Sequence, residues 1–274
     1  MNTIRSYIEN RLLHVRTVLQ AEYPGRYPEI TAFIDQYIQN PVYPEDKGSI
    51  ADAIFRSDRA EPVLPPVVSD FLMDIYHDLA EDGNAGAMCN IGALYKTGRC
   101  GAQDDEKAVY WYSMSAAAGN LQATENLGYC YYYGFGTAID YERAYVCFTK
   151  AALGGLTNSV YKVGDLYRYG YYVDRDPAMA FHLYTRAAME LSNSMTPEIG
   201  ADIFRRIGDC YYEAIGTGQD YSTALSAYQR AESLFYPKLS NGDDKALAGL
   251  NHVLERQALC RRAIAQGIKL LREL

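Results

Sequence analysis

Aspartate is the residue type placed most regularly for chemistry in this 274-residue chain. Asp104, Asp140 and Asp176 recur every 36 residues, and Asp220 follows 44 residues later. Paired carboxylates can act as general acids and bases. One aspartate per repeated segment instead indicates helix capping, because the carboxylate accepts hydrogen bonds from the free backbone N–H groups of a first helical turn.

Other catalytic or metal-binding patterns are missing from the sequence. No two of the six cysteines have the C-x-x-C spacing of a zinc or redox site, and the four histidines do not cluster with them. There is no Walker loop and no G-x-S-x-G elbow, and the glycines at 134 and 136 lack the third glycine of a dinucleotide fingerprint. We expect no metal, cofactor or catalytic residue, and we expect His182 at the surface or between repeats. An enzyme whose site forms only in three dimensions stays an alternative.

Composition restricts the class of partner. The net charge of −8 argues against nucleic acid and against anionic membrane surfaces, and it favours a basic protein or peptide. The N-terminal segment carries charges among its apolar residues, unlike a signal peptide, and no stretch approaches eighteen apolar residues. We therefore expect a cytoplasmic protein. The 26 tyrosines, against 8 phenylalanines and 1 tryptophan, are typical of surfaces that are half core and half contact.

An internal repeat positions these residues. Segments starting at Gly83, Gly119 and Gly155 align without a gap, and a fourth copy follows after eight extra residues around LSNSMTPEIG, which we expect to lengthen a turn or a helix end. The period and the two apolar segments per copy predict a pair of helices, A and B. A glycine inside helix A (92, 128 or 164) should let helix B approach closely, and a second glycine (98, 134 or 170) should end helix A. The repeated aspartate should then begin helix B.

The repeat NIGALYKTGRCGAQDDEKAVYWYSMSAAAG and its copies resemble the Sel-like repeat family, a relative of the tetratricopeptide repeat. This resemblance implies an all-α fold: a right-handed α-solenoid of stacked antiparallel helix pairs, with helical flanks at both ends. The third copy departs from the pattern with Leu191 in place of a closing glycine. The cysteine pairs that cross-link repeats in some secreted members of the family are absent. The resemblance also implies an adaptor role.

Three regions follow from this frame: a helical N-terminal region at 1–66, the repeat array at 67–236, and a C-terminal cap at 237–274. In the first region we predict helices over 3–21 and 28–39, a loop over 40–48 and a short helix over 49–59, and residues 67–81 should form helix B of an earlier copy. The cap reads as one amphipathic helix or a helix pair. Its apolar stripe should hold Leu247, Leu250, Leu254 and Ala258, with a break near Cys260 or an Arg261 side chain that reaches water.

The predicted contact surface is the concave helix-A face of copies two to four. Helix A should bury one stripe, and a second stripe about 150° away should face a partner. Tyrosine and arginine on that stripe are the residue types that anchor binding surfaces. It holds Glu125, Tyr129, Tyr132, Tyr133, Tyr161, Asp165, Arg168, Tyr169, Arg205, Asp209, Tyr212 and Glu213. We expect a non-catalytic scaffold or adaptor for a protein or peptide. The alternative is a dedicated inhibitor that neutralises one cognate enzyme or toxin.

Overall fold

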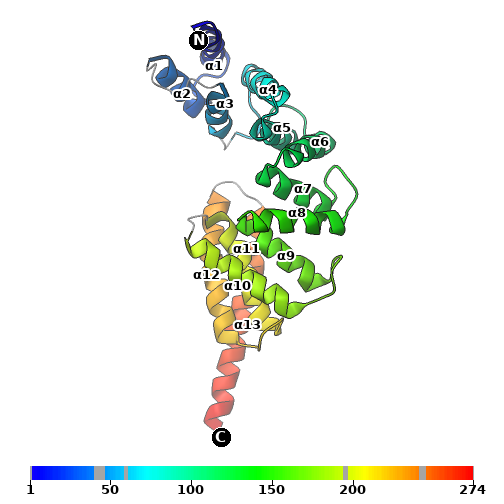
Figure 1. Ribbon diagram of the computed structural model, residues 1–274. Coiled ribbons are helices and arrows are strands. Elements are labelled where there is room, and N and C mark those ends of the chain that lie inside the picture. Colours follow the sequence, from blue (N-terminus) through cyan, green and yellow to red (C-terminus); the bar gives the residue numbers. More distant parts are fainter. Residues whose placement is uncertain (1, 40–46, 59–60, 194–196, 241–244, 274) are drawn as a thin grey trace. The chain divides into compact units, whose positions relative to one another are not determined.

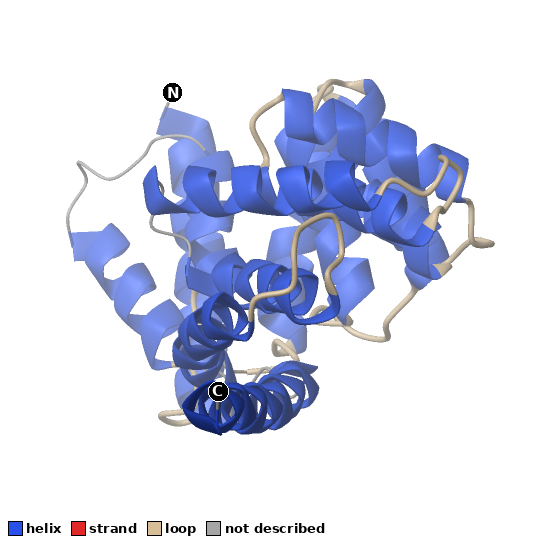
Figure 2. Ribbon diagram, turned by 90° about the horizontal axis from the view of Figure 1, so that it is seen from below, coloured by secondary structure: helices blue, strands red, loops and turns tan. Residues whose placement is uncertain are grey.

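The computed structural model describes residues 2–39, 47–58, 61–193, 197–240 and 245–273, and these contain thirteen α-helices and no strand (Figures 1 and 2). In chain order they are α1 Asn2–Glu22, α2 Pro28–Gln39, α3 Lys47–Arg56, α4 Pro66–Glu81, α5 Ala85–Thr97, α6 Asp105–Ala117, α7 Leu121–Tyr133, α8 Tyr141–Leu153, α9 Thr157–Tyr169, α10 Pro177–Asn193, α11 Pro197–Glu213, α12 Tyr221–Ser240 and α13 Lys245–Glu273. Within each of the two units described below, consecutive helices pack against each other. The predicted all-α solenoid of helix pairs is confirmed.

The chain forms two compact units. Unit 1 is Met1–Ile139 and holds α1 to α7, and unit 2 is Asp140–Leu274 and holds α8 to α13. Each unit has its own apolar core: α1 to α5 supply that of unit 1, and α9 to α13 supply that of unit 2. The helix-A segments of the four copies are α5, α7, α9 and α11, and the helix-B segments are α6, α8, α10 and α12.

The predicted capping residues occupy the predicted places. The carboxylates of Asp104, Asp140 and Asp176 each accept a hydrogen bond of 2.9 Å from a backbone N–H in the first turn of helix B. Asp220 does the same for α12, from Ser222 at 2.9 Å. Helices α5, α7 and α9 each end at a glycine in the left-handed region, with φ values of 67°, 75° and 72°. The repeated aspartates are therefore helix caps.

The glycine inside helix A allows close packing in three copies. A Cβ atom at Gly92 would lie 2.7 Å from the ring of Tyr112, and one at Gly164 would lie 2.8 Å from Tyr184. At Gly208 the distance to the ring of Tyr228 would be 2.6 Å. Each glycine thus seats an aromatic ring of helix B directly on the backbone of helix A, as the repeat predicted.

The fourth copy has an alanine where the others have a terminating glycine. Ala214 follows α11 with a φ of 56°, a conformation that L-residues adopt at a cost of about 1–2 kcal/mol. Replacing it with glycine should relieve that strain, although the freer unfolded chain offsets part of the gain. We expect Ala214→Gly to raise the unfolding free energy by about 1 kcal/mol in urea denaturation. Ala258→Gly, on the exposed side of α13, should lower it by a similar amount, and a loss from both changes would contradict this assignment.

The N-terminal region follows the predictions, with α1 and α2 over the expected ranges and α3 packed against α4 as an earlier helix pair. Buried Arg99, in the segment after α5, is tied to the C-terminal end of α3, since its guanidinium donates to the carbonyls of Phe55, Ser57 and Asp58. Residues 40–46 of the predicted loop lie outside the described residues.

The eight extra residues of the fourth copy lengthen helix ends: α10 and α11 have 17 residues each, whereas α5 to α9 have 13.

Helix α13 is continuous through Cys260 and the Arg261 side chain is exposed, which is the second of the two predicted alternatives. The predicted apolar stripe was wrong, because Leu247, Leu254 and Ala258 are exposed. The buried stripe instead holds Leu250, Val253, Gln257 and Cys260. A polar residue fits there because Gln257 donates to Glu232 of α12 at 2.7 Å and accepts from exposed Arg261 at 2.7 Å. The prediction missed this arrangement because it assigned only apolar residues to the buried side of the helix.

No helix in the described part of the chain is both long enough and apolar enough to cross a membrane.

Candidate functional site

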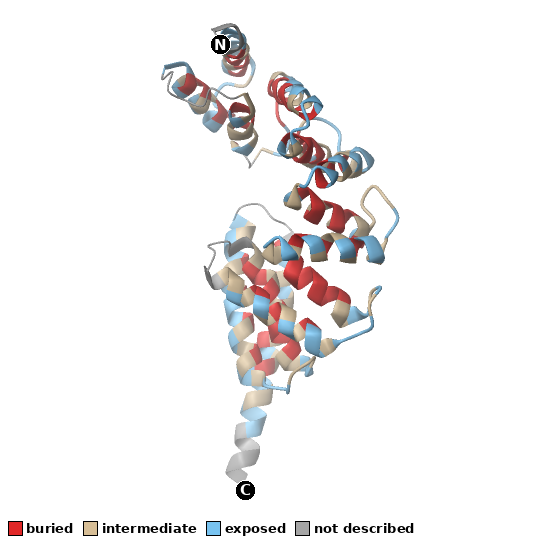
Figure 3. Cartoon of the chain, in the orientation of Figure 1, coloured by how far each residue is buried: buried red, intermediate tan, exposed pale blue. Residues whose placement is uncertain are grey.

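The twelve residues of the predicted contact surface fall into both units: four lie on α7 in unit 1, and eight lie on α9 and α11 in unit 2. Seven reach solvent at least in part: Tyr129, Tyr133, Arg168, Tyr169, Arg205, Tyr212 and Glu213. Five are buried: Glu125, Tyr132, Tyr161, Asp165 and Asp209. The expectation that the whole stripe faces a partner was therefore wrong for these five. Helix A is covered on more than one side, as Figure 3 shows for α9, which is buried along most of its length.

Two of the buried residues, Asp165 and Asp209, hold helix B in place. Asp165 accepts a hydrogen bond of 2.8 Å from the hydroxyl of Tyr184, and Asp209 accepts one of 2.8 Å from Tyr228. Each aspartate directly follows the helix-A glycine that seats the same tyrosine ring. The sequence carried only a partial signal for this pairing. The second copy has Phe148 at the helix-B position and Tyr129 after its glycine, but the first copy has Tyr112 although Ala93 follows its glycine.

Asp165 also forms a buried ion pair between α9 and α11. The guanidinium of Arg206 donates to both of its carboxylate oxygens, at 2.6 and 2.7 Å, and both side chains are almost fully enclosed. Burial alone would raise the pKa of Asp165, but the charge and hydrogen bonds of Arg206 outweigh it and lower the pKa to about 2. This two-point contact fixes the spacing of the two helices.

A chain of charged side chains continues from this pair across α9, α11 and α13. Arg168 lies 3.5 Å from Asp209 and 3.5 Å from Glu213. From α13, the Nε2 atom of His252 lies 2.9 Å from Asp209, and Arg256 donates to Glu213 at 2.6 Å. The guanidinium of Arg256 also lies 4.5 Å from the centre of the Tyr212 ring. We call this surface the charged face; it consists of Arg168, Tyr212, Glu213, His252 and Arg256, with the buried Asp209 in contact with Arg168 and His252.

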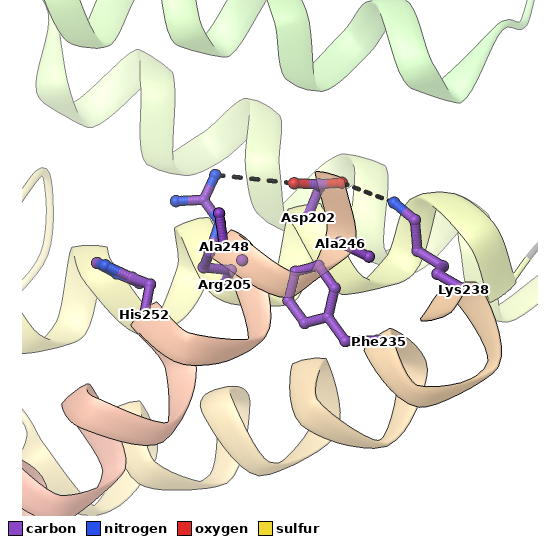
Figure 4. Close-up of a pocket in the computed structure, with 8 residues that line it drawn as sticks. Asp202, Arg205, Phe235, Lys238, Ala246, Ala248 and His252 are labelled. Atoms are coloured by element: carbon purple, nitrogen blue, oxygen red, sulfur yellow. Dashed lines mark hydrogen bonds and ion pairs between the residues drawn. The ribbon is translucent and has the colours of Figure 1, made fainter. Parts of the chain in front are cut away.

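A pocket of about 400 Å³ adjoins the charged face between α11, α12 and α13. Figure 4 shows the Asp202 carboxylate between Arg205 and Lys238. Its oxygen atoms lie 3.8 Å from a nitrogen of Arg205 and 3.2 Å from the nitrogen of Lys238. His252 lines the same pocket. Burial opposes ionisation of Asp202, but Arg206, Lys238 and Arg205 outweigh it and lower its pKa. The remaining lining residues are Phe235, Ala246, Ala248 and Gly249.

Eight residues of this pocket and charged face were not predicted, because they lie outside the aligned stripe; four of them carry charged or titratable side chains, namely Asp202, Lys238, His252 and Arg256. Lys238 stands at the end of α12, and His252 and Arg256 stand on α13. The amphipathic pattern of α13 predicted only a cap. In the repeats, each of the earlier B helices is followed by a helix A. This alternation could have predicted that α13, which follows α12, takes a helix-A position beside α11.

Two smaller hollows are less polar. One of about 180 Å³ in unit 2 lies among α8, α9 and α10, and includes Val160, Leu183 and the highly exposed Leu153. One of about 200 Å³ in unit 1 includes Tyr129 and Phe135, with the ammonium of Lys96 lying 3.6 Å from the centre of the Phe135 ring. Within the described ranges, no three His, Cys, Asp or Glu side chains are arranged to hold a metal ion. His182 is exposed on α10, as expected.

Comparison with known proteins identifies the repeat. The Sel1 repeat family model matches residues 85–120, 121–156, 157–190 and 205–234. A Sel1 repeat protein from Oxalobacter formigenes has a similar structure, with a TM-score of 0.55, 22% identity, and coverage of 81% of this chain and 95% of that one. The protein c5321 of uropathogenic Escherichia coli, a protective antigen with an SLR fold, also has a TM-score of 0.55, at 20% identity over 92% of this chain.

The chain spans only 58% of the length of c5321, and at these identities both similarities concern the fold alone. No curated protein matches the chain. The four matched repeats, together with the helix pairs that carry them, show that this chain belongs to the Sel1 repeat (Sel-like repeat) proteins.

Proposed function

We propose that this protein is a non-catalytic scaffold or adaptor, and that unit 2 binds a partner protein or peptide through the charged face and its adjoining pocket. Proteins built from Sel1 repeats generally mediate protein–protein interactions. The observation that carries the proposal is the pocket, because it gathers Arg205, a predicted contact residue, with Lys238 and His252 from two further helices.

The charged face suits recognition because it is held in place before a partner arrives. Its residues lie on helices, and the buried pair of Arg206 and Asp165 fixes α9 against α11. Side chains already ordered in the free protein lose less entropy on binding. Tyr212 and Arg256, stacked on one another at the surface, are of the types that most often dominate binding energy.

Charge is distributed unevenly between the units. Unit 1 carries 18 acidic and 10 basic residues, whereas unit 2 carries 16 of each, so the whole net charge of −8 belongs to unit 1. A basic segment of a partner would therefore be drawn to unit 1, as the predicted preference for basic partners requires. Unit 2 has no such bias, and its contacts depend on local pairing at the charged face.

Alanine substitution tests this proposal once a partner has been identified by affinity purification and mass spectrometry. We expect Tyr212→Ala to weaken that partner's binding at least about tenfold in isothermal titration calorimetry, because an aromatic anchor is lost. The control is Tyr110→Ala, which removes a more exposed tyrosine of α6 in unit 1 and should change the affinity less than about twofold. Equal affinities of the two folded variants would contradict the assignment. The stoichiometry would also separate a scaffold with several partners from an inhibitor with one.

A further inference from the structure

We infer that the pocket between α11, α12 and α13 is a carboxylate site: it receives a glutamate side chain or a C-terminal carboxylate of the bound partner. This inference rests on the proposed function and names the group that the partner presents. Three features of the molecule support it: the charge balance around the pocket, the hydrogen-bond donors of Arg205, and the mixed polar and apolar lining.

The charges that line the pocket favour an anion. The described lining holds two permanent cations, Arg205 and Lys238, and one carboxylate, Asp202. A further carboxylate would therefore meet more positive than negative charge on this lining.

Arg205 is the residue best able to take a further carboxylate. Its closest acidic neighbours are Asp209 at 3.4 Å and Asp202 at 3.8 Å, both longer than the 2.7–2.9 Å of a strong charge-assisted hydrogen bond. A guanidinium has five N–H donors in a planar fork that matches a carboxylate. An incoming carboxylate can therefore form closer contacts with Arg205 than the resident acids do, with Lys238 and His252 lining the same space.

Asp202 competes with a partner's carboxylate for the cations of the pocket. Its own carboxylate already lies between Arg205 and Lys238, which shows that the two cations are spaced to share one such group (Figure 4). A partner's carboxylate must approach against its negative charge. Removing that charge while keeping the shape of the side chain should strengthen anion binding, whereas removing the charge of Arg205 should weaken it.

The lining residues also indicate that the carboxylate is attached to an apolar group. A volume of about 400 Å³ exceeds that of a carboxylate alone, and Ala248 and Gly249 offer an accessible apolar surface beside the nearly enclosed Phe235 and Ala246. Methylene groups of glutamate, or the aliphatic side chain of a C-terminal residue, would bury apolar area there. Free mineral anions lack this apolar part.

Two-dimensional NMR titrations of the full chain test the inference with defined probes. The probes are N-acetylglutamate amide for a side-chain carboxylate, N-acetylleucine for a C-terminal carboxylate, N-acetylglutamine amide as the neutral control, and inorganic phosphate. We expect at least one carboxylate probe to shift amide signals of α11 and α13 around the pocket, and the glutamine probe to leave them unchanged. The stronger of the two carboxylate probes identifies the source of the group.

Two variants should change the affinity for the carboxylate probe in opposite directions. Arg205→Gln should weaken the carboxylate probe about tenfold, Asp202→Asn should strengthen it severalfold, and Arg186→Gln on α10 should leave it unchanged. A gain in Asp202→Asn cannot arise from misfolding, so it decides the case if Arg205→Gln is unstable. Equal binding of the glutamine probe, unchanged affinity in Asp202→Asn, or stronger binding of phosphate than of either carboxylate would overturn the inference. If the carboxylate probes fail while Tyr212→Ala still weakens the partner, only the carboxylate assignment is lost.

Discussion

Replacing Arg206 with methionine should lower the unfolding free energy by about 3–5 kcal/mol, the largest loss that we expect from a single charged residue. The change leaves the carboxylate of Asp165 buried between α9 and α11 without its two-point partner, while methionine fills much of the volume. Urea denaturation followed by circular dichroism measures the loss.

The matched control is Arg186→Met on α10. Arg186 pairs with Glu190 one helical turn away at a half-exposed surface, so this change should cost about 1 kcal/mol or less. If Arg206→Met cost no more than the control, the buried pair would not hold α9 and α11 together.

The same ion pair predicts how stability depends on pH. The folded chain lowers the pKa of Asp165 from its ordinary value of 3.8 to about 2, so the unfolded chain binds more protons as the pH falls between these values. The stabilisation is therefore fully present above about pH 4 and is lost as the pH falls towards 2. The difference in unfolding free energy between the wild type and Arg206→Met should shrink over this interval, and a constant difference would contradict the assignment.

Gly208→Ala should lower the unfolding free energy by about 1–3 kcal/mol, even though alanine is the better helix former by about 1 kcal/mol. Its Cβ would lie 2.6 Å from two ring atoms of Tyr228. That ring cannot swing away easily, because it is fully buried and its hydroxyl is bound to Asp209. Overpacking therefore outweighs the gain in helix propensity.

Gly267→Ala is the control for this substitution. Gly267 lies in α13, and a methyl group added at its Cα would meet no atom within 4 Å. Alanine there should therefore leave the stability unchanged or raise it by up to about 1 kcal/mol. Urea denaturation of both variants gives the comparison. A gain at Gly208 similar to that at Gly267 would show that the close approach of α12 to α11 does not depend on glycine.

The repeat explains why so much of the fold could be predicted. Caps such as Asp176 and helix ends such as Gly170 act through backbone geometry within a few residues, so their spacing in the sequence carries over directly into the structure. The glycines at 164 and 208 could be interpreted in the same way, because one helix-B tyrosine returns at a fixed distance from each.

The candidate site was harder to predict because it depends on contacts between helices. Helical periodicity places Asp165 and Arg168 on one stripe. It does not show that Arg206 pairs with Asp165 and that both aspartate and arginine of this stripe are largely enclosed. Side chains from α12 and α13 complete the pocket, and their positions depend on the packing register. Gln257 shows the same limit, since its buried amide is stable only beside Glu232.

Site-specific photo-crosslinking tests most directly whether the charged face of unit 2 is the contact surface. A photoreactive phenylalanine analogue placed at Tyr212 should form a covalent adduct with the partner, and the same analogue placed at exposed His182 on α10 should not. Crosslinking from position 182 with none from position 212, in two equally folded variants, would contradict the account.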